Sequence, residues 1–391
     1  MTKEKRPFSW RKLFNDIHLW LGIGSGLILF LVCLSGTVYT FRSEIERALE
    51  ADKYKAEAKA GVERLTVEQI VRKTEAETGG KVSSVAIPHA EDETYRLSVK
   101  TSPEERRGTG YFIDPYTAEI KGTSGGPASE FFMVMFRMHR WLLMDSSIGR
   151  PIVGTATVIF VFILLTGIVL WFPKKLKNWK QGLKIKTDSN WKRINHDLHN
   201  TLGFYSFILL LVMSLTGLCW SFEWYRDGLG AVLGAEVFGG RGEKPPVSDA
   251  GGTPAATLSA EEFISIADKQ LLYEGDYRIS LPGEPEAPVV IMKTGVGFFA
   301  SSGRDVLYLN QYSGEVLKAD IFSEKPFNQK ITSSIKPLHT GEILGTFSKI
   351  LYFIACLVAT SLPVTGTIIW LNKLKKKAKR KNKKKRAVVA G

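Results

Sequence analysis

Five of the six histidines in this chain lie at the ends of long apolar stretches, where their rings could bind a metal-containing group. His18 opens one stretch, and His196 and His199 stand three residues apart before another, in the sequence NHDLHNTLG. His139 and His339 precede the remaining two stretches. Ionisable side chains at membrane boundaries are costly and usually functional. We therefore expect these five residues to carry the chemistry, and the sixth histidine, alone in a polar segment, to be exposed.

Four stretches are long and apolar enough to cross a membrane. Residues 17–41, 151–172, 201–222 and 350–371 each contain at least 22 residues without Asp, Glu, Lys or Arg, and about 20 helical residues span a bilayer core. The first is longer than the roughly 7–15 apolar residues of a signal peptide, so we expect it to remain as an anchor. All three cysteines lie within these stretches, a pattern that does not indicate a disulfide framework.

The distribution of charge predicts the orientation of these helices. The net charge is +14, and the segments 174–193 and 373–386 carry eight and eleven Lys or Arg residues against a single Asp. The long segment 42–138 has 15 basic and 17 acidic residues, and 223–340 has 11 and 16. Positive residues stay on the cytoplasmic side, so both termini are expected inside and both long segments outside. The basic tail abuts a span, which favours binding to anionic lipid over nucleic acid.

An internal repeat relates the apolar stretches in pairs. At an offset of 181 residues, His18 aligns with His199 and Gly22 with Gly203. In the second and fourth stretches, Thr166-Gly167 aligns with Thr365-Gly366, and His139 falls within one residue of His339.

The two long outer segments share a pattern of elements. Each contains a capping box that begins a helix, at Thr66 and at Ser259. Each continues as strand, turn and strand, at 111–120 and 307–316. The sequence therefore predicts a membrane protein with four transmembrane α-helices in two parallel repeats about an axis along the membrane normal, and one α+β domain outside the membrane in each repeat.

These patterns divide the chain into nine predicted segments. They are a cytoplasmic N-terminus 1–16, a first spanning helix 17–41, a first outer domain 42–138, an interfacial segment with the second spanning helix 139–172, a basic cytoplasmic loop 173–198, a third spanning helix 199–222, a second outer domain 223–338, a fourth spanning helix 339–371 and a basic cytoplasmic tail 372–391.

Two histidines from facing helices suit a haem iron better than a zinc ion. Zinc takes three or four protein ligands, and no carboxylate or thiol recurs beside His18 and His199 in the repeat. A haem iron needs one imidazole above and one below its ring. Gly22, Gly26 and Gly203, one or two helical turns beyond the histidines, would leave room for a macrocycle, although small residues are also ordinary helix contacts in membranes.

Each apolar stretch also carries a Ser/Thr-Gly pair far from its histidine. Because neighbouring helices alternate in direction, each face of the membrane should have two helices that present histidine and two that present such a pair, and we expect the pairs to open space. We predict that His18 and His199 ligate an inner haem iron, and that His139 and His339 ligate an outer one. The four pairs are Ser35-Gly36, Thr166-Gly167, Thr216-Gly217 and Thr365-Gly366.

Other polar residues near the predicted ligands have expected roles. His196 aligns with Asn15 in the repeat, so it has no histidine mate. We expect it to lie about one turn nearer the cytoplasm than His199, where it could hydrogen-bond a haem propionate, relay protons or be an ordinary exposed residue. The alternative, that His196 ligates and His199 packs, stays open. Three cations are expected to pair with the outer propionates: Arg137, Arg140 and Lys336.

The chain resembles the PepSY-associated transmembrane family over about residues 10 to 372. The shared features are the H-x3-G starts at His18 and His199, the Ser/Thr-Gly helix ends, and the turns DPYTAEI and NQYSGEV, the second with Asn310-Gln311 in place of Asp-Pro. The chain is most similar to FoxB-type ferri-siderophore reductases of the bacterial inner membrane. This resemblance implies two periplasmic PepSY-like domains, two haem b groups and reduction of siderophore-bound iron on the periplasmic side.

The leading hypothesis is a transmembrane electron conduit. A cytoplasmic or quinol donor would reduce the inner haem, and the outer haem would reduce a ferric siderophore or other ferric chelate, releasing Fe(II). One alternative is a non-enzymatic membrane regulator or anchor whose PepSY-like domains bind a periplasmic partner. Another is a transporter, which the parallel repeats suggest and the absence of acidic residues from the spans disfavours.

Overall fold

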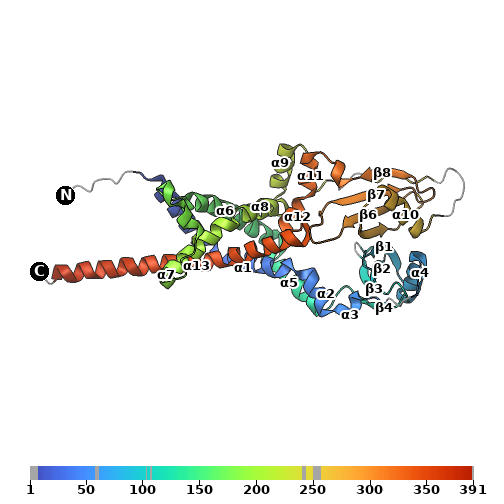
Figure 1. Ribbon diagram of the computed structural model, residues 1–391, viewed down its shortest axis with the longest axis horizontal. Coiled ribbons are helices and arrows are strands. Elements are labelled where there is room, and N and C mark those ends of the chain that lie inside the picture. The colour runs from blue at the N-terminus through green and yellow to red at the C-terminus, as the bar shows by residue number, and fades with distance from the viewer. Residues whose placement is uncertain are drawn as a thin grey trace.

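The molecule is elongated, with a helical bundle in its middle and a β-sheet at one end (Figure 1). The computed structural model describes residues 8–57, 61–102, 104–105, 108–239, 244–249 and 257–389. α1 begins, and α13 ends, at the end of the molecule far from the sheet. The bundle is formed by α1 (Trp10–Thr40), α6 (Ser146–Trp171), α8 (Gly203–Ser221) and α13 (Gly345–Val389).

The bundle helices match the four apolar stretches, which confirms the prediction of four helices able to span a membrane. Large apolar side chains lie exposed on their outer faces, and Leu27, Phe162 and Ile208 expose 73%, 54% and 68% of their surface. Contiguous apolar surface of this kind is unfavourable in water. The bundle is therefore built for a lipid bilayer.

The third spanning helix contains a π-helical turn at the sequence NHDLHNTLG (195–203), called here the double-histidine motif. α7 (Trp191–Asp197) leads into the π-helical turn η2 (Leu198–Leu202), which continues as α8. His199 lies in this turn, whereas α1 passes His18 as an uninterrupted α-helix. Single π-helical turns within α-helices are frequent at functional sites.

Two of the predicted spans begin or end differently in the structure. His139 lies on a separate helix, α5 (Pro127–Trp141), and His339 on α12 (Ile335–Thr340), so neither is part of the spanning helix that follows it. α13 continues past the predicted end of the span at Leu371 as an exposed basic helix. Lys and Arg favour helix, and this stretch contains neither Gly nor Pro to end it.

The outer segments meet in one eight-stranded antiparallel sheet, in the order β4-β3-β2-β1-β5-β6-β7-β8. The sequence predicts two separate α+β units, but β1 pairs with β5 and joins them, with Val85 opposite Ile279. The strands are β1 (Lys81–Ile87), β2 (Tyr95–Lys100), β3 (Thr109–Ile113), β4 (Ile120–Thr123), β5 (Gly275–Ser280), β6 (Val289–Gly295), β7 (Arg304–Leu309) and β8 (Val316–Asp320).

Two helices pack against the sheet through one shared hydrophobic core. They are α4 (Val67–Thr78) and α10 (Ala260–Gln270), and both predicted capping boxes are present. The helices also cap each other, because Glu261 accepts a hydrogen bond from the N–H of Val67 at 2.7 Å and Glu68 one from Ala260 at 2.6 Å. A carboxylate is favourable at a helix N-terminus, so this exchange ties the two halves together.

The two equivalent turns of the sheet use different residues for the same fold. Asp114 Oδ1 accepts hydrogen bonds from two N–H groups within its turn, and Asn310 Oδ1 does the same. The second side-chain atom differs: Asp114 Oδ2 accepts from the N–H of Glu57, whereas Asn310 Nδ2 donates to the carbonyl of Asp249. The change from Asp114 to Asn310 thus matches a change in the neighbouring backbone group. That group is an N–H donor, from Glu57, in the first turn and a carbonyl acceptor, from Asp249, in the second.

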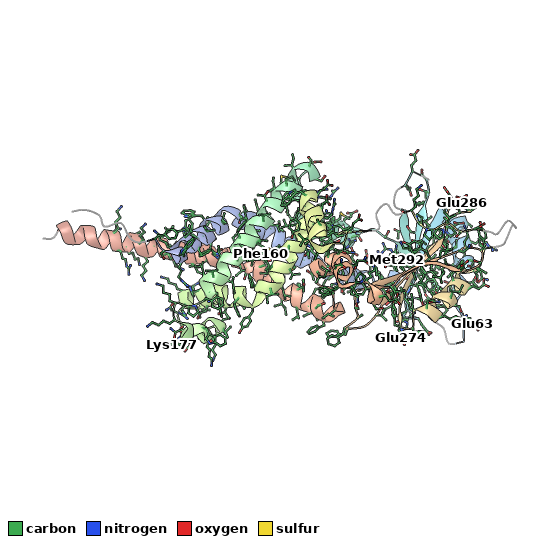
Figure 2. The ribbon with its side chains drawn as sticks, turned by 90° about the horizontal axis from the view of Figure 1, so that it is seen from above. Glu63, Phe160, Lys177, Glu274, Glu286 and Met292 are labelled. Carbon is green, nitrogen blue, oxygen red and sulfur yellow. The ribbon has the colours of Figure 1, made fainter. Side chains whose placement is uncertain are left out.

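Short elements connect the bundle to the sheet and to the basic loop. Figure 2 shows Lys177 at the end far from the sheet, Phe160 within the bundle, and Glu63, Glu274 and Glu286 at the sheet end. The chain therefore segregates its charge along the long axis. The connecting elements are α2 (Arg42–Leu49), α3 (Ala51–Tyr54), η1 (Leu176–Leu183), α9 (Glu223–Leu233), η3 (Phe322–Glu324) and α11 (Phe327–Ser333).

Candidate functional site

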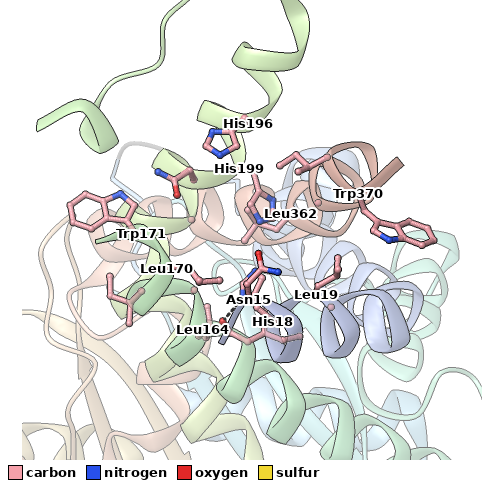
Figure 3. A pocket seen from close by; sticks show the side chains of 18 of the residues that line it. Asn15, His18, Leu19, Leu164, Leu170, Trp171, His196, His199, Leu362 and Trp370 are labelled. Carbon is pink, nitrogen blue, oxygen red and sulfur yellow. Dashed lines mark hydrogen bonds between the residues drawn. The ribbon is translucent and has the colours of Figure 1, made fainter. Parts of the chain in front are cut away.

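The two inner histidines face each other across a cavity at the end of the bundle far from the sheet (Figure 3). The ring centres of His18 and His199 are 6.2 Å apart. The cavity has a volume of about 550 Å³, and its lining includes both rings, Trp171 and Trp370. A cavity of this size is in the range that holds a cofactor-sized ligand.

The two outer histidines form a second pair at the opposite end of the bundle. His139 on α5 and His339 on α12 have ring centres 6.1 Å apart, and the indole of Trp220 lies 5.2 Å from His339. Burial lowers the pKa of both imidazoles, that of His339 to about 4. Both rings are therefore neutral at pH 7, the form in which imidazole binds metals.

Each of the four rings is docked on the neighbouring helix through its Nδ1 atom. His18 Nδ1 lies 3.0 Å from the carbonyl oxygen of Ile163, and His139 and His339 Nδ1 lie 2.9 Å from the carbonyls of Val32 and Met213. An Nδ1–H that donates to such an oxygen fixes the tautomer and leaves the Nε2 lone pair available to a metal.

His199 is docked by the side chain of Thr365 and by the backbone of Leu362. Its Nδ1 lies 2.9 Å from Oγ1 of Thr365. The side chain of Asn195, which is almost fully buried, donates to the carbonyl of the same threonine at 3.0 Å. Asn195 thus joins the double-histidine motif to α13, a role that sequence reasoning missed because its repeat position is not polar.

The Ser/Thr-Gly pairs are the docking sites for these rings. Each hydroxyl bonds to carbonyls three and four residues earlier, and the carbonyl three residues earlier is the one that faces the histidine at Ile163, Val32 and Met213. A Cβ added at each glycine would meet a ring carbon: His139 Cε1 at 2.9 Å from Gly36, His339 Cε1 at 3.0 Å from Gly217, and His18 and His199 Cε1 at 3.2 Å from Gly167 and Gly366. The space that these glycines open is used by the imidazole rings, and Gly167 and Gly366 also border the inner cavity.

The other glycines divide between cavity and helix contact. Gly22 and Gly203 line the inner cavity, and a Cβ at Gly22 would meet nothing within 4 Å. Gly26 instead faces α13, where a Cβ added at Gly26 would lie 3.8 Å from Cβ of Pro363. Two of the three glycines expected to make room thus border the cavity, and the third is an ordinary helix contact.

His196 differs from the other histidines of the bundle. Its side chain is 54% exposed, its Nδ1 lies 3.4 Å from Oδ1 of Asp197, and it borders the mouth of the cavity. The ring that pairs with His18 is that of His199. His89 is exposed on the sheet, as expected, 3.5 Å from Glu274.

The three cations expected near the outer pair are not equivalent. Arg137 and Lys336 are exposed. Arg140 is half-buried, its guanidinium stacks on the rings of Phe136 and Trp141 at 5.4 and 5.3 Å, and its charge contributes to the low pKa of both outer histidines. The structure thus places only Arg140 at the outer pair.

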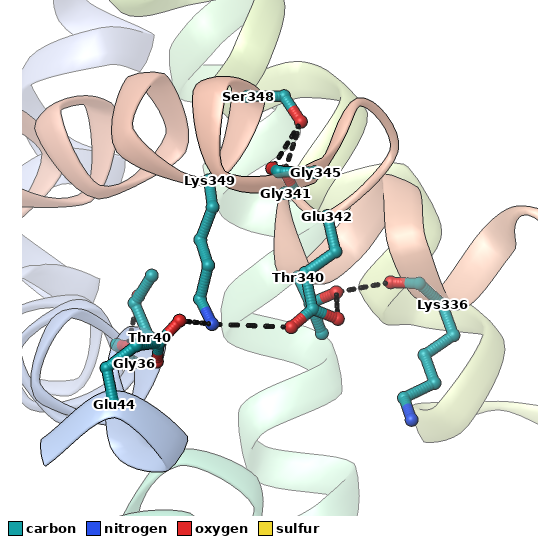
Figure 4. A network of polar contacts seen from close by, with 10 residues as sticks. All are labelled: Gly36, Thr40, Glu44, Lys336, Thr340, Gly341, Glu342, Gly345, Ser348 and Lys349. Atoms are coloured by element: carbon teal, nitrogen blue, oxygen red, sulfur yellow. Dashed lines mark hydrogen bonds and ion pairs between the residues drawn. The ribbon is translucent and has the colours of Figure 1, made fainter. Parts of the chain in front are cut away.

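An ion-pair network holds the elements around the outer pair (Figure 4). Lys349, buried at the start of α13, donates to Glu44 at 2.7 Å and to Glu342 at 3.4 Å. Glu342 also accepts a hydrogen bond from the hydroxyl of Thr340, the residue after His339. The network therefore links the α12–α13 turn to α2 and fixes the position of α12.

The donor set of each pair fits a haem iron. Two nitrogen ligands at about 2 Å on opposite sides of one metal ion place the imidazole centres roughly 6 Å apart, close to the observed 6.2 and 6.1 Å. Among the described residues, no cluster of three or more His, Cys, Asp or Glu side chains could hold a metal ion by itself. The three cysteines are free and lie within the spans.

A comparison with known families gives a match over most of the chain. A family model described as the PepSY-associated TM region matches residues 16–373. The chain belongs to this family. The match includes the four spanning helices, the sheet between them and both histidine pairs, so the family relationship concerns the whole architecture. A comparison with curated proteins finds no significant match.

Proposed function

We propose that this protein is a dihaem electron-transfer protein of the bacterial inner membrane that reduces a ferric siderophore, or another ferric chelate, at the periplasmic face. Haem b would be held by His18 and His199 at the inner site and by His139 and His339 at the outer site. One electron reduces each Fe(III) to Fe(II), which such chelators bind weakly and release. The electron donor is a cytoplasmic reductant or a membrane quinol.

The observation that carries this proposal is the repetition of one docking arrangement at both ends of the bundle. All four imidazoles are held through Nδ1 and, among the described residues, none of their Nε2 atoms has a polar partner. Structural histidines in a protein core normally use both nitrogens or face water. Four rings with the same free nitrogen, paired 6.2 and 6.1 Å apart, support two ligand sets.

The residues around each pair prepare it for one-electron chemistry. A haem iron with two imidazole ligands supplies that chemistry when bound, with its potential set by hydrogen bonds to the ligands and by burial. The docked Nδ1 groups keep the imidazole rings from rotating. The bundle excludes water between the pairs, because Leu164, Leu210, Ala355 and Ala359 form a buried cluster there.

The membrane orientation of the proposal rests on charge. The basic loop and tail lie at the inner-pair end, and the acidic segments form the sheet end. The positive residues favour the cytoplasm, which puts two PepSY-like repeats of the sheet in the periplasm and both termini inside. The parallel-repeat description belongs to this same proposal.

The proposal is tested first by colour and then by turnover. Purified protein should show a Soret band that shifts on addition of dithionite, with two haems per chain. Reduced protein mixed with a ferric siderophore should be reoxidised as Fe(II) appears in a ferrozine assay. A colourless protein obtained from haem-replete cells would refute the proposal.

The orientation is tested by topology reporters. A periplasmic reporter fused after Gly391 should be inactive, and the same reporter inserted at Gly251-Gly252 should be active. These three residues lie outside the described part of the chain. The reverse pattern would place the outer pair, and the proposed substrate, on the cytoplasmic side.

A further inference from the structure

Buried nitrogen donors at the turn between α5 and α6 lack acceptors. Nε of Arg150 and Nε1 of Trp141 are buried, and neither has a hydrogen-bond partner among the described residues. The guanidinium carbon of Arg140 lies 5.3 Å from the centre of the Trp141 ring. Buried polar groups are almost always satisfied, so two unused buried donors beside one turn indicate a missing acceptor.

Two positive charges lie beside this turn. The guanidinium of Arg150 is near enough to that of Arg140 for the two charges to repel each other. Within the described part of the chain, neither guanidinium takes part in an ion pair. Two like charges in a partly buried site are unfavourable unless an anion lies between them.

The repeat shows that the same position is neutralised in the other half. The spacing of 199 residues that separates Thr166 from Thr365 also separates Arg150 from Lys349. Lys349 has two carboxylate partners, Glu44 and Glu342 (Figure 4). The chain thus supplies counter-ions for the cation of the second half and none for that of the first.

The backbone of the α5–α6 turn, beside these donors, is strained. Leu142 and Leu143 are consecutive residues with left-handed φ angles of 53° and 61°, which are costly for branched side chains. The turn packs so closely that a Cβ on Gly149 would lie 2.1 Å from the carbonyl oxygen of Trp141. Backbone strain of this kind persists where function over-determines the geometry.

We propose that Arg140, Trp141 and Arg150 form a carboxylate-binding site beside the outer histidine pair. The planar guanidinium forks match the two oxygens of a carboxylate, and the indole N–H adds a third donor. The inference rests on the proposed function for the source of the carboxylate. It is either a propionate of the porphyrin bound by His139 and His339 or a carboxylate of the ferric chelate.

The test compares Arg150→Gln and Arg140→Gln with the control Arg137→Gln. Arg137 is on the same helix but is exposed, so it lies outside the site. Each protein is purified with its haem, the potential of each haem is titrated, and KM is measured for ferric citrate and for a ferric hydroxamate without carboxylates. Trp141→Phe removes one donor without a charge and serves as a milder variant if an arginine variant does not fold.

The two sources of carboxylate give different results. A bound propionate predicts that Arg150→Gln shifts the reduction equilibrium of one haem at least tenfold toward the oxidised form, or 59 mV for one electron, with both KM values unchanged. A carboxylate of the chelate predicts at least a tenfold rise in KM for ferric citrate, with the potentials and the KM for the hydroxamate unchanged. Arg150→Lys keeps the charge without the fork and should restore only part of either effect.

The inference is overturned if all the variants match Arg137→Gln in potentials and in both KM values. Such a result would refute the carboxylate site and leave the proposed function intact. Should the wild-type protein contain no haem, calorimetric titration with citrate tests the site directly. Citrate should then bind the wild type and Arg137→Gln at least tenfold more tightly than Arg150→Gln, and equal or absent binding in all three would refute the site.

Discussion

The inner and outer histidine pairs use the same docking arrangement on different supports. His18 and His199 belong to spanning helices, and their rings border a cavity of about 550 Å³. His139 and His339 lie on short helices outside the spans, where an indole and the Lys349 network hold them. A Cβ added at the facing glycine would also lie closer to the outer rings, at 2.9 and 3.0 Å, than to the inner rings, at 3.2 Å for both.

This difference in support indicates how strongly each histidine pair depends on its surroundings. The inner histidines are fixed by long helices that the bilayer itself stabilises, so their positions depend little on any one contact. The position of His339 depends on local packing, because α12 has only six residues and such a short helix is not stable by itself. We therefore expect the outer pair to respond more strongly to small changes in its surroundings.

The largest effects should come from removal of a ligand. His139→Ala and His199→Ala should each halve the haem content measured by pyridine haemochrome, and His139→Ala should abolish chelate reduction because the proposed substrate is reduced at the outer site. Full haem loading in His139→Ala would contradict the outer assignment.

The inner pair offers a matched control for ligand removal. His196→Ala should keep both haems, since its ring is largely exposed and does not face His18. A reversed result, with the inner haem lost in His196→Ala and retained in His199→Ala, would mean that His196 is the inner ligand and His199 a packing residue.

A methyl group at a docking glycine should disturb the outer pair more than the inner pair. Gly36→Ala places Cβ 2.9 Å from His139, whereas Gly167→Ala places it 3.2 Å from His18. Overpacking costs about 1–3 kcal/mol, so Gly36→Ala should weaken outer haem binding about tenfold, and Gly167→Ala should weaken inner binding less.

The glycine variants are compared by their rates of haem dissociation, which are measured as the released haem is captured by apomyoglobin. Gly24→Ala is the control, because its Cβ meets nothing within 4 Å and the change tests helix propensity alone. Equal rates for Gly36→Ala and Gly24→Ala would show that the close contact in the structure does not constrain the ring.

The smallest expected effect distinguishes a ring that contacts a hydroxyl from a ring that does not. Thr365→Val removes the Oγ1 that lies 2.9 Å from His199 Nδ1, whereas Ser35→Ala leaves the Val32 carbonyl that faces His139. A hydrogen-bonded Nδ1–H makes the imidazole a stronger electron donor. Its loss, worth about 0.5–1.5 kcal/mol, should raise the potential of the inner haem in Thr365→Val, and Ser35→Ala should leave the outer potential nearly unchanged.

Redox titration of the haems in Thr365→Val and Ser35→Ala measures both shifts in potential. If Ser35→Ala shifts the potential of its haem as much as Thr365→Val, a direct contact between the hydroxyl and Nδ1 is not what sets the potential.

The sequence by itself determined the features that depend on local pattern. Apolar runs without charge defined four spanning helices, because burying a charge in lipid is costly. Capping boxes at Thr66 and Ser259 determine where two helices begin, because their hydrogen bonds join residues only three positions apart in the sequence. The repeat predicted which histidines are equivalent, since it compares positions along one chain and needs no distances.

Only the tertiary structure decided which atoms meet. The fusion of the outer segments into one sheet follows from the β1–β5 pairing, which joins residues almost 200 positions apart and has no local signal. The Ser/Thr-Gly pairs were visible in the sequence, but their contact with imidazole rings depends on the packing of neighbouring helices at distances near 3 Å. Arg150 and Lys349 occupy one repeat position, yet the carboxylates that neutralise only Lys349 come from the α1–α2 junction and the α12–α13 turn, and such a difference in surroundings exists only once the chain has folded.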